Sequence, residues 1–317
     1  MLLAMSCIGL VDAIAKHLAS GLEGVQVTWG YFATMLLFLA VWAPCAAFGS
    51  SRHAASLSRR AAAVAGIRAL LETRHPGLQC LRAACLVASL TCLFTALAYL
   101  GLAEATVIGF TSPLFVVTLA SPLLRERPSR ASRVAVSLGF LGALVVIRPG
   151  TTLFQWAALL PLLGAVFFAL FNLLTRKLGA LDPPRATLFY TFCLGTVLLS
   201  AALPWFWVPM SPPEIGFALL SGLLGLVAHA SMVRALSLGR ASALAPINYI
   251  RIVWATGIGY VAFREVPDLA TLLGGAIIVF SGLLVAWAAA TAVPALAGGA
   301  SILSRSHERV DRPGSQR

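Results

Sequence analysis

Charged residues are scarce in this 317-residue sequence. Asp, Glu, Lys and Arg together make up 11% of the chain, whereas hydrophobic residues make up 59%. A water-soluble domain of this length cannot bury so much apolar surface, so the composition excludes an ordinary soluble fold. The lipid bilayer must therefore be the solvent for much of the chain. Because one helical crossing of the hydrocarbon core needs about 20 apolar residues, the number of long apolar stretches gives the number of expected membrane helices.

The signatures of several enzyme and cofactor classes are also missing. The sequence has no H-E-x-x-H zinc motif, no G-x-S-x-G elbow, no Walker loop and no D-G-x-x-A-R lipid-transferase motif. These absences argue against an enzyme and against ATP-driven transport within this chain. The six cysteines form no C-x-x-C pair and have no histidine partners at metal spacing, so they are interpreted as packing residues. No metal and no cofactor is expected.

The net charge of +12 does not indicate nucleic-acid binding, because the basic residues are spread between apolar segments and form no single patch. The expected partners are the lipid bilayer and a small-molecule substrate. Monomer and homodimer both remain open as oligomeric states.

Ten apolar segments, each bounded by Gly, Pro or charged residues, predict an all-α integral membrane fold with ten transmembrane helices. The first segment contains Asp12 and Lys16 and has no basic region before it, so we expect a retained helix and no cleaved signal peptide. A start upstream of Met1 stays open. The segments are residues 2–19, 27–48, 80–101, 105–124, 131–148, 154–175, 185–204, 214–236, 241–263 and 268–290.

The distribution of Lys and Arg predicts the orientation of these helices. With a cytoplasmic N-terminus, 19 of the 23 basic residues fall in cytoplasmic connections or in the C-terminal tail, when Arg82 at the start of the third segment is counted with the connection before it. Basic loops stay on the cytoplasmic side of the membrane, so both termini are expected there. A missed or invented crossing would move every later loop to the other side, which supports an even number of helices.

Two regions are expected to lie outside the bilayer. Residues 49–79 alternate Arg with Ala and Leu, which fits either an amphipathic helix on an anionic lipid surface or a solvated cytoplasmic loop. Residues 293–317 are rich in Gly, Ser and Arg and lose apolar periodicity, so they predict a disordered cytoplasmic tail.

An internal repeat divides the sequence. The turn Arg125-Glu126-Arg127-Pro128 recurs 139 residues later (265 minus 126) as Arg264-Glu265-Val266-Pro267, and a Gly-rich segment follows each copy. Five predicted helices separate the two turns, so they face opposite sides of the membrane. This pattern predicts two inverted five-helix repeats, residues 1–150 and 151–292, an architecture typical of alternating-access carriers. Chance similarity between two apolar helix pairs is the alternative. The glycines themselves are interpreted as packing residues.

Several motifs resemble the EamA-type drug/metabolite transporter family. The first half carries Glu104-Ala105-Thr106-Val107-Ile108-Gly109-Phe110-Thr111-Ser112-Pro113 and the run from Gly139 to Gly150, and the second half carries Ala245-Pro246-Ile247-Asn248-Tyr249 and Glu265-Val266-Pro267-Asp268. The resemblance covers all ten segments. It implies a ten-helix inverted-repeat carrier of small metabolites in the bacterial inner membrane, outward in many members and inward in some. The Asp12-Ala13-x-x-Lys16 pattern is similar to relatives that take up S-adenosylmethionine.

The sequence departs from the family pattern at two places. Tyr31 stands where the subgroup usually carries an arginine, which removes an expected substrate or pairing charge from the second segment. Arg125 and Arg264 replace the glycine that usually precedes the turn glutamate.

Ionisable residues within the segments are the strongest candidates for a substrate site. A charge in the hydrocarbon core costs at least about 2.5 kcal/mol, so it needs a cavity or a partner. Asp12 and Arg251 each lie about ten residues, or about 15 Å, into their segments, near the membrane midplane. We expect these two side chains to meet across the repeat interface and to pair or to bind a zwitterionic or anionic substrate. The alternatives are a purely structural ion pair, or pairing of Asp12 with Lys16 one turn away.

Other polar and aromatic residues are weaker candidates. His229 is a candidate for proton coupling, with an interhelical hydrogen bond as the alternative. Glu126 and Glu265 at the repeated turns are interpreted as caps or gate residues that pair with neighbouring arginines. Pro113 and Pro246 are expected to break backbone hydrogen bonding in the fourth and ninth segments. The remaining substrate-binding candidates, for which packing is the alternative, are Trp254, Asn248, Tyr249, Tyr99, Phe171 and Asn172.

The sequence as a whole favours a gradient-coupled secondary transporter that exports amino-acid-like or drug-like solutes. Uptake of S-adenosylmethionine or a related metabolite is the alternative. A membrane-embedded lipid-modifying enzyme or a channel agrees less well with the missing motifs and with the inverted repeat.

Overall fold

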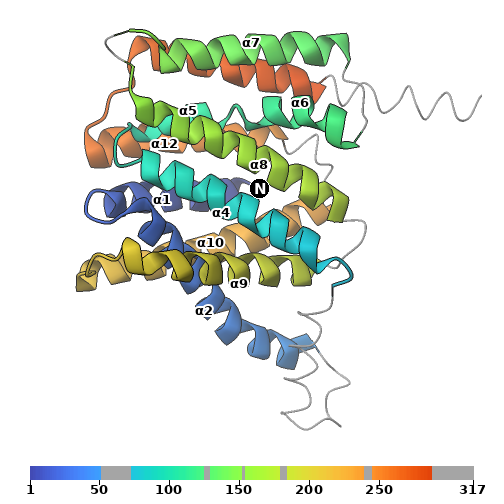
Figure 1. Ribbon diagram of the computed structural model, residues 1–317, viewed down its shortest axis with the longest axis vertical. Coiled ribbons are helices and arrows are strands. Elements are labelled where there is room, and N and C mark those ends of the chain that lie inside the picture. Colours follow the sequence, from blue (N-terminus) through green and yellow to red (C-terminus); the bar gives the residue numbers. More distant parts are fainter. Residues whose placement is uncertain (51–72, 125–128, 152–153, 179–183, 239–244, 288–317) are drawn as a thin grey trace, which may run out of the picture.

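The computed structural model describes residues 1–50, 73–124, 129–151, 154–178, 184–238 and 245–287, and this part of the chain is helical and without strands. The first half runs in chain order along α1 (Leu2–Ala19), α2 (Gly24–Ser50), α4 (Pro76–Ala96), α5 (Leu102–Gly109), α6 (Ser112–Leu124) and α7 (Arg130–Ile147). The elements lie side by side with short turns at one end of the bundle (Figure 1).

The second half begins with the 3-10 turn η2 (Trp156–Ala158) and α8 (Leu159–Leu178). It continues through α9 (Pro184–Ala202), η3 (Leu203–Trp205), α10 (Pro212–Leu238), η4 (Ala245–Tyr249) and α12 (Ile250–Phe263). The last described helix spans Leu269–Trp287.

Nine helices in the described ranges are long and apolar enough to cross a membrane. They coincide with nine of the ten predicted segments, which confirms the all-α membrane class. The ninth predicted segment, residues 241–263, is described only from Ala245 as η4 and α12, so the count of ten stays a prediction. The residues of the repeated Arg125-Glu126-Arg127 turn, most of the 49–79 connection and the predicted tail lie outside the described residues.

The third and fourth predicted segments differ from the structure in ways that bear on the site. The third was predicted to begin at residue 80, but α4 begins at Pro76, because proline is favoured at the first position of a helix. The fourth was predicted as one helix over 105–124, but it is divided into α5 and α6 between Gly109 and Ser112. Pro113 follows the break directly, as expected of a residue that cannot donate a backbone hydrogen bond.

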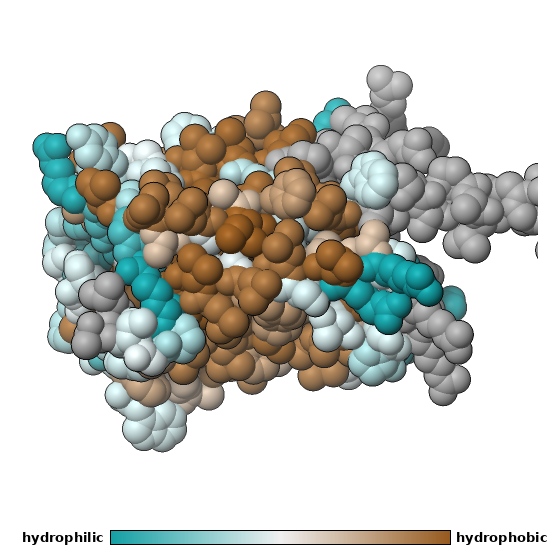
Figure 2. All heavy atoms as spheres, turned by 90° about the horizontal axis from the view of Figure 1, so that it is seen from above, coloured by the Kyte–Doolittle hydropathy of each residue, from teal (hydrophilic) through white to brown (hydrophobic). Residues whose placement is uncertain are grey.

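Apolar side chains form a band around the outside of the bundle. Figure 2 shows brown apolar residues across the middle of one face, with hydrophilic residues gathered at the two ends. Among the exposed large side chains are Val134 and Leu141 of α7 and Leu272 and Phe280 of the last described helix. Such a surface is stable only in contact with lipid tails, which agrees with the membrane composition of the chain.

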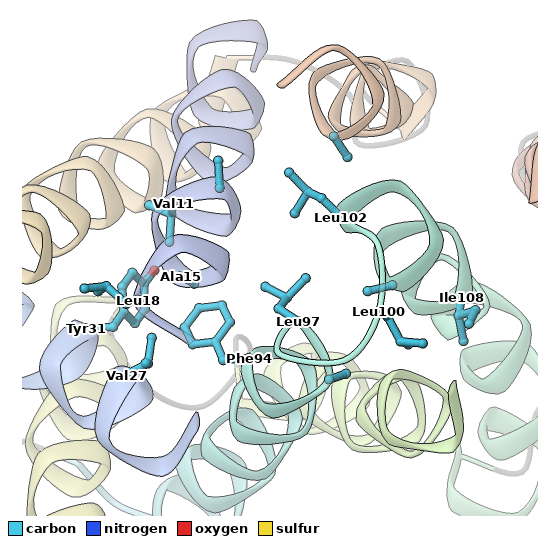
Figure 3. Close-up of a cluster of buried hydrophobic side chains, with 14 of the residues drawn as sticks. Val11, Ala15, Leu18, Val27, Tyr31, Phe94, Leu97, Leu100, Leu102 and Ile108 are labelled. Atoms are coloured by element: carbon cyan, nitrogen blue, oxygen red, sulfur yellow. The ribbon is translucent and has the colours of Figure 1, made fainter. Parts of the chain in front are cut away.

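Part of the buried apolar core lies where α1, α2, α4 and α5 meet. Figure 3 shows Ala15 and Leu18 of α1 beside Tyr31 of α2, with Phe94 of α4 close by and Leu102 on the neighbouring α5. All five side chains are buried. This core holds α1 in a fixed position relative to α4, and α1 carries Asp12 and Lys16.

Glycines bring α7 and the last described helix into backbone contact. A Cβ added to Gly142 would lie 2.9 Å from the Gly274 carbonyl oxygen, and one added to Gly274 would lie 2.6 Å from the Gly142 carbonyl oxygen. The two helices can approach this closely only because both positions lack a side chain. The interpretation of these glycines as packing residues is confirmed here.

Candidate substrate site

Asp12 of α1 and Arg251 of α12 form a two-point ion pair in the interior of the bundle. Arg251 Nε lies 2.5 Å from Asp12 Oδ2, and Arg251 Nη2 lies 2.9 Å from Asp12 Oδ1. Asp12 is 3% exposed. Parallel hydrogen bonds between a guanidinium and a carboxylate fix both distance and orientation. The structure therefore brings together the two charges that the sequence placed at one depth.

Close packing of α1 on α12 positions this pair. Trp254, one turn after Arg251, donates from Nε1 to Ser6 Oγ at 2.9 Å. Gly9 lies between Ser6 and Asp12 on α1, and a Cβ added there would lie 2.8 Å from Trp254 Cβ. The glycine therefore lets α12 approach until the Arg251 guanidinium reaches the carboxylate. Trp254 is 39% exposed, so its side chain is not fully enclosed by the helices.

Two interrupted helices meet next to the pair. Phe110, in the break between α5 and α6, stacks on Tyr249 of η4 with ring centroids 5.1 Å apart. Asn248 precedes Tyr249, and its Oδ1 is buried without a hydrogen-bond partner among the described residues. An unpaired amide oxygen three residues before Arg251 is a free acceptor for a donor group on a ligand.

A second ion pair ties α1 to both halves of the chain. Lys16 Nζ lies 2.7 Å from Glu265 Oε1 and donates to the Leu100 carbonyl oxygen at 2.6 Å. Glu265 Oε2 accepts from the Leu102 backbone N–H at 2.9 Å and so satisfies the first turn of α5. The predicted capping role of Glu265 is observed, but its predicted arginine partner is wrong because Lys16 occupies that place. Pairing of Asp12 with Lys16 is excluded by the same geometry. Glu126 lies outside the described residues.

A small cavity of about 150 Å³ adjoins Glu265. Three carboxylate residues, Glu104, Glu265 and Asp268, contribute to its wall. Arg148 at the end of α7 forms an ion pair with Asp268. The hydrogen bond from Arg148, together with one from the Thr271 backbone N–H, lowers the pKa of the Asp268 carboxyl. Asp268 is therefore an anion that joins the two halves of the chain at this end.

The structure spreads the remaining predicted site residues over other places. Tyr99 lies in the turn after α4, is 56% exposed and packs on Trp156. Asn172 donates to the Phe168 carbonyl oxygen within α8 at 2.8 Å. The His229 ring lies 2.9 Å, through Nδ1, from the Gly225 carbonyl oxygen of its own helix and packs edge-on against Phe192. Phe171 belongs to a different cluster around Arg82, so a single pocket with all eight candidates is not observed.

Comparison with known proteins identifies the family. The sequence matches the family model described as the EamA-like transporter family over residues 1–148 and over residues 155–287. The chain belongs to the EamA-like transporter family. The resemblance stated from the motifs is thereby confirmed.

Curated relatives of this EamA-like chain carry different small molecules by name. The pseudopaline exporter CntI of Pseudomonas aeruginosa strain PAO1 is 33% identical over 195 residues, 60% of this chain and 68% of the exporter. An S-adenosylmethionine uptake transporter of Rickettsia felis is 28% identical over 238 residues, 75% of this chain and 78% of that protein. A riboflavin transporter of Vibrio cholerae is 31% identical over 218 residues, 68% of this chain and 73% of that protein.

A solved crystal structure supports the same fold. It aligns with a TM-score of 0.55 at 16% identity and covers 90% of this chain and 94% of its own. The EamA-like protein is thus a multi-pass membrane transporter of a small metabolite, and its relatives are transporters and not enzymes.

Sequence reasoning missed one buried cation of the EamA-like fold. Arg82 was assigned to the cytoplasmic connection before the third segment, which is wrong, because it lies inside α4 and is 5% exposed. The signal was available in Pro76-Gly77, since a proline at the first helical position places Arg82 almost two turns into the helix. Tyr31 was noted only as a departure from the family pattern, yet it is buried within electrostatic range of Asp12 and Arg251.

Proposed function

We propose that this chain is a gradient-coupled carrier that moves an amino-acid-like metabolite by alternating access, with export as its working direction. Its two halves, residues 1–150 and 151–292, act as inverted five-helix repeats in the bacterial inner membrane, with both termini cytoplasmic. The two separate family-model matches, over residues 1–148 and 155–287, support this division. The basic residues of the predicted cytoplasmic connections support the orientation.

The Asp12–Arg251 pair is the observation that carries the substrate class. It places one anion and one cation side by side in the interior, held by two hydrogen bonds. A zwitterionic α-amino acid group presents the complementary charges, so its ammonium can replace Arg251 at Asp12 while its carboxylate replaces Asp12 at Arg251. Exchange of partners without loss of charge neutrality keeps the desolvation cost low in both states.

Neighbouring groups give this site its shape. Asn248 supplies a free acceptor oxygen, Trp254 supplies a partly exposed aromatic side chain, and Tyr249 closes the wall with Phe110. Discontinuous helices next to a midplane charge are the usual surroundings of substrates in carriers with inverted repeats. His229 is the proton-coupling group in this proposal, because it is a titratable imidazole that is half-buried in α10 next to Phe192.

Uptake of S-adenosylmethionine is the second candidate. The relative from Rickettsia felis bears that name at 28% identity, and the substrate contains the same α-amino acid group. Both candidates use the same charge pair. They differ in the direction of transport and in the side chain of the substrate.

Counterflow in proteoliposomes tests the proposal. Vesicles that contain purified protein are loaded with unlabelled methionine, S-adenosylmethionine or riboflavin, and uptake of the labelled compound is followed. We expect transient accumulation of at least one amino-acid-bearing compound in the wild type, none in Arg251→Gln, and wild-type behaviour in Arg133→Gln, which removes an exposed arginine of α7. Conductance that ignores the internal load would indicate a channel, and normal counterflow by Arg251→Gln would refute the charge-pair site.

A further inference from the structure

Arg82 is a buried cation whose hydrogen-bond partners among the described residues are all neutral groups. Its Nε donates to Thr175 Oγ1 of α8 at 2.6 Å, and its Nη1 donates to Thr191 Oγ1 of α9 at 2.6 Å and to the Thr187 carbonyl oxygen at 3.4 Å. The guanidinium lies 4.4 Å from the centroid of the Phe171 ring. Three helices therefore enclose a charge that none of them neutralises.

Two partly buried cations, Lys16 and Arg251, differ from Arg82 in this respect. Lys16 pairs with Glu265, and Arg251 pairs with Asp12. Within the described ranges no carboxylate forms an ion pair with Arg82, and no group accepts a hydrogen bond from its Nη2. A cation without a counter-ion inside a membrane bundle is costly, so its presence calls for an anion that arrives during the working cycle.

The groups around Arg82 are suited to an oxyanion. The two threonine hydroxyls already donate to carbonyl oxygens of their own helices, Thr175 to Phe171 and Thr191 to Thr187. They therefore orient the guanidinium as acceptors, and they leave its Nη2 edge for a ligand. Gln79 adds an amide that donates to Thr187 Oγ1 at 3.1 Å, and His229 lies within electrostatic range. A planar guanidinium with a free edge binds carboxylate and phosphate groups in particular.

The position of Arg82 separates it from the central pair. It lies near the start of α4, about 22 Å along the helix axis from Leu97, whose carbonyl oxygen Lys16 contacts. Its partners lie near the end of α8 and in the first half of α9. Arg82 is thus at the end of the bundle opposite Glu265, which is the cytoplasmic end in the proposed orientation.

We propose that Arg82, with Thr175, Thr191 and Phe171, forms a second binding station for an oxyanion group of the transported metabolite, reached from the cytoplasmic end before the substrate meets Asp12 and Arg251. The station rests on the proposed carrier function and narrows its substrate class to molecules with a carboxylate or phosphate group beyond the one that Arg251 receives. A carboxylate that replaces solvent at the Nη2 edge would neutralise the buried charge.

A substrate-free measurement separates this role from a structural one. Thermal unfolding of the purified full-length protein in a neutral detergent is compared for wild type, Arg82→Gln, Arg251→Gln and Arg133→Gln. Because Arg82 has no counter-ion in the described part of the chain and its threonine partners keep their own hydrogen bonds, Arg82→Gln is expected to unfold at or above the wild-type midpoint. Arg251→Gln leaves the Asp12 carboxylate unpaired and is expected to unfold about 5 °C or more below wild type. A midpoint for Arg82→Gln as low as that of Arg251→Gln would show a structural arginine and overturn the station.

A ligand measurement on the same samples identifies the anion. At constant ionic strength we add sodium phosphate, or L-glutamate with L-glutamine as its neutral match, and compare detergent with nanodiscs that contain phosphatidylglycerol. We expect phosphate or glutamate to raise the wild-type midpoint, glutamine to have no such effect, and Arg82→Gln to need about tenfold more anion, which corresponds to the loss of one charge-assisted contact. Arg82→Lys should retain part of the response because it keeps the charge.

The remaining outcomes overturn the proposal. If neither solute raises the wild-type midpoint above its control, Arg82 binds no solute oxyanion. If only phosphatidylglycerol acts through Arg82, the anion is a lipid headgroup and not a substrate group. These readouts need no transport, so a carrier that fails in counterflow and a station that fails to bind are distinguished.

Discussion

Asp12 and Arg251 are 239 positions apart in the chain and form the two-point ion pair that joins α1 to α12. The carboxylate is almost completely buried, whereas the guanidinium is partly accessible. This asymmetry means that a ligand can approach the cation first, which suits a site that exchanges its internal partner for a substrate.

The Asp12–Arg251 pair predicts that a double variant regains stability without regaining transport. Asp12→Asn or Arg251→Gln alone leaves one buried charge unpaired and should lower the free energy of unfolding by about 3–5 kcal/mol. The double variant removes both charges and should recover most of that loss, because two neutral amides can hydrogen-bond. Thermal unfolding measures the recovery, and counterflow should stay absent in all three. Transport by the double variant would contradict the substrate role.

The Lys16–Glu265 pair predicts control of access to the small cavity at this end. Glu265→Gln removes the ion pair and weakens the contact with Leu102, so the cavity should open more often. In a protein whose native cysteines are replaced, Thr256→Cys on the cavity wall should react faster with a membrane-impermeant maleimide when Glu265→Gln is also present. Glu214→Gln is the matched control, because that carboxylate bonds only locally to Ser211 in the described structure. Equal labelling rates in both backgrounds would refute a gating role.

The Arg148–Asp268 pair predicts a pH dependence with a defined sign. The hydrogen bond from Arg148 lowers the pKa of the Asp268 carboxyl, so its stabilising effect is complete above the unfolded value of about 3.9 and is lost as the pH falls through the lowered value. Asp268→Asn keeps a good helix cap at Thr271 but removes the charge. Its thermal midpoint should lie slightly below wild type at pH 7, and the two should converge below about pH 4. A difference that does not change with pH would assign the effect to something other than the ion pair.

The glycine contact between α7 and the last described helix predicts a steric limit. Gly142→Ala places a methyl group 2.9 Å from the Gly274 carbonyl oxygen and should destabilise the protein by about 1–3 kcal/mol. Gly216→Ala in α10 meets nothing within 4 Å, so it should be neutral or slightly stabilising through helix propensity. Thermal unfolding in detergent compares the two variants, and an equally tolerated Gly142→Ala would show that the helices separate easily.

Much of the fold could be predicted from the sequence, because length and hydropathy are enough to identify a membrane helix. The nine described membrane helices coincide with predicted segments, and the depth of Asp12 and Arg251 could be read from a fixed rise per residue. The inverted orientation of the halves stays a prediction, supported by the recurring turn and by the two family-model matches.

The rest depended on contacts that no local pattern encodes. Apolar residues predict that the third segment begins at residue 80, which omits the first turn of α4 and makes Arg82 look like part of the cytoplasmic connection. Glu265 stands next to Arg264 in sequence, but Arg264 has a left-handed backbone conformation, and the carboxylate reaches Lys16 instead. Helical spacing places Trp254 one turn from Arg251, but only tertiary packing brings Phe171 to Arg82.

Three contacts of Lys16 and Glu265 link the end of α1 to the start of α5. Lys16 binds the carbonyl that precedes α5 and the Glu265 carboxylate, and Glu265 in turn binds the first N–H of α5. A movement that pulls α1 away from this end of the bundle breaks both contacts of Lys16 at once, whereas Glu265 can keep its bond to the Leu102 N–H. The movement would leave Lys16 without its carboxylate partner in a place where its side chain is largely shielded from solvent, and this cost opposes separation of the helices at this end.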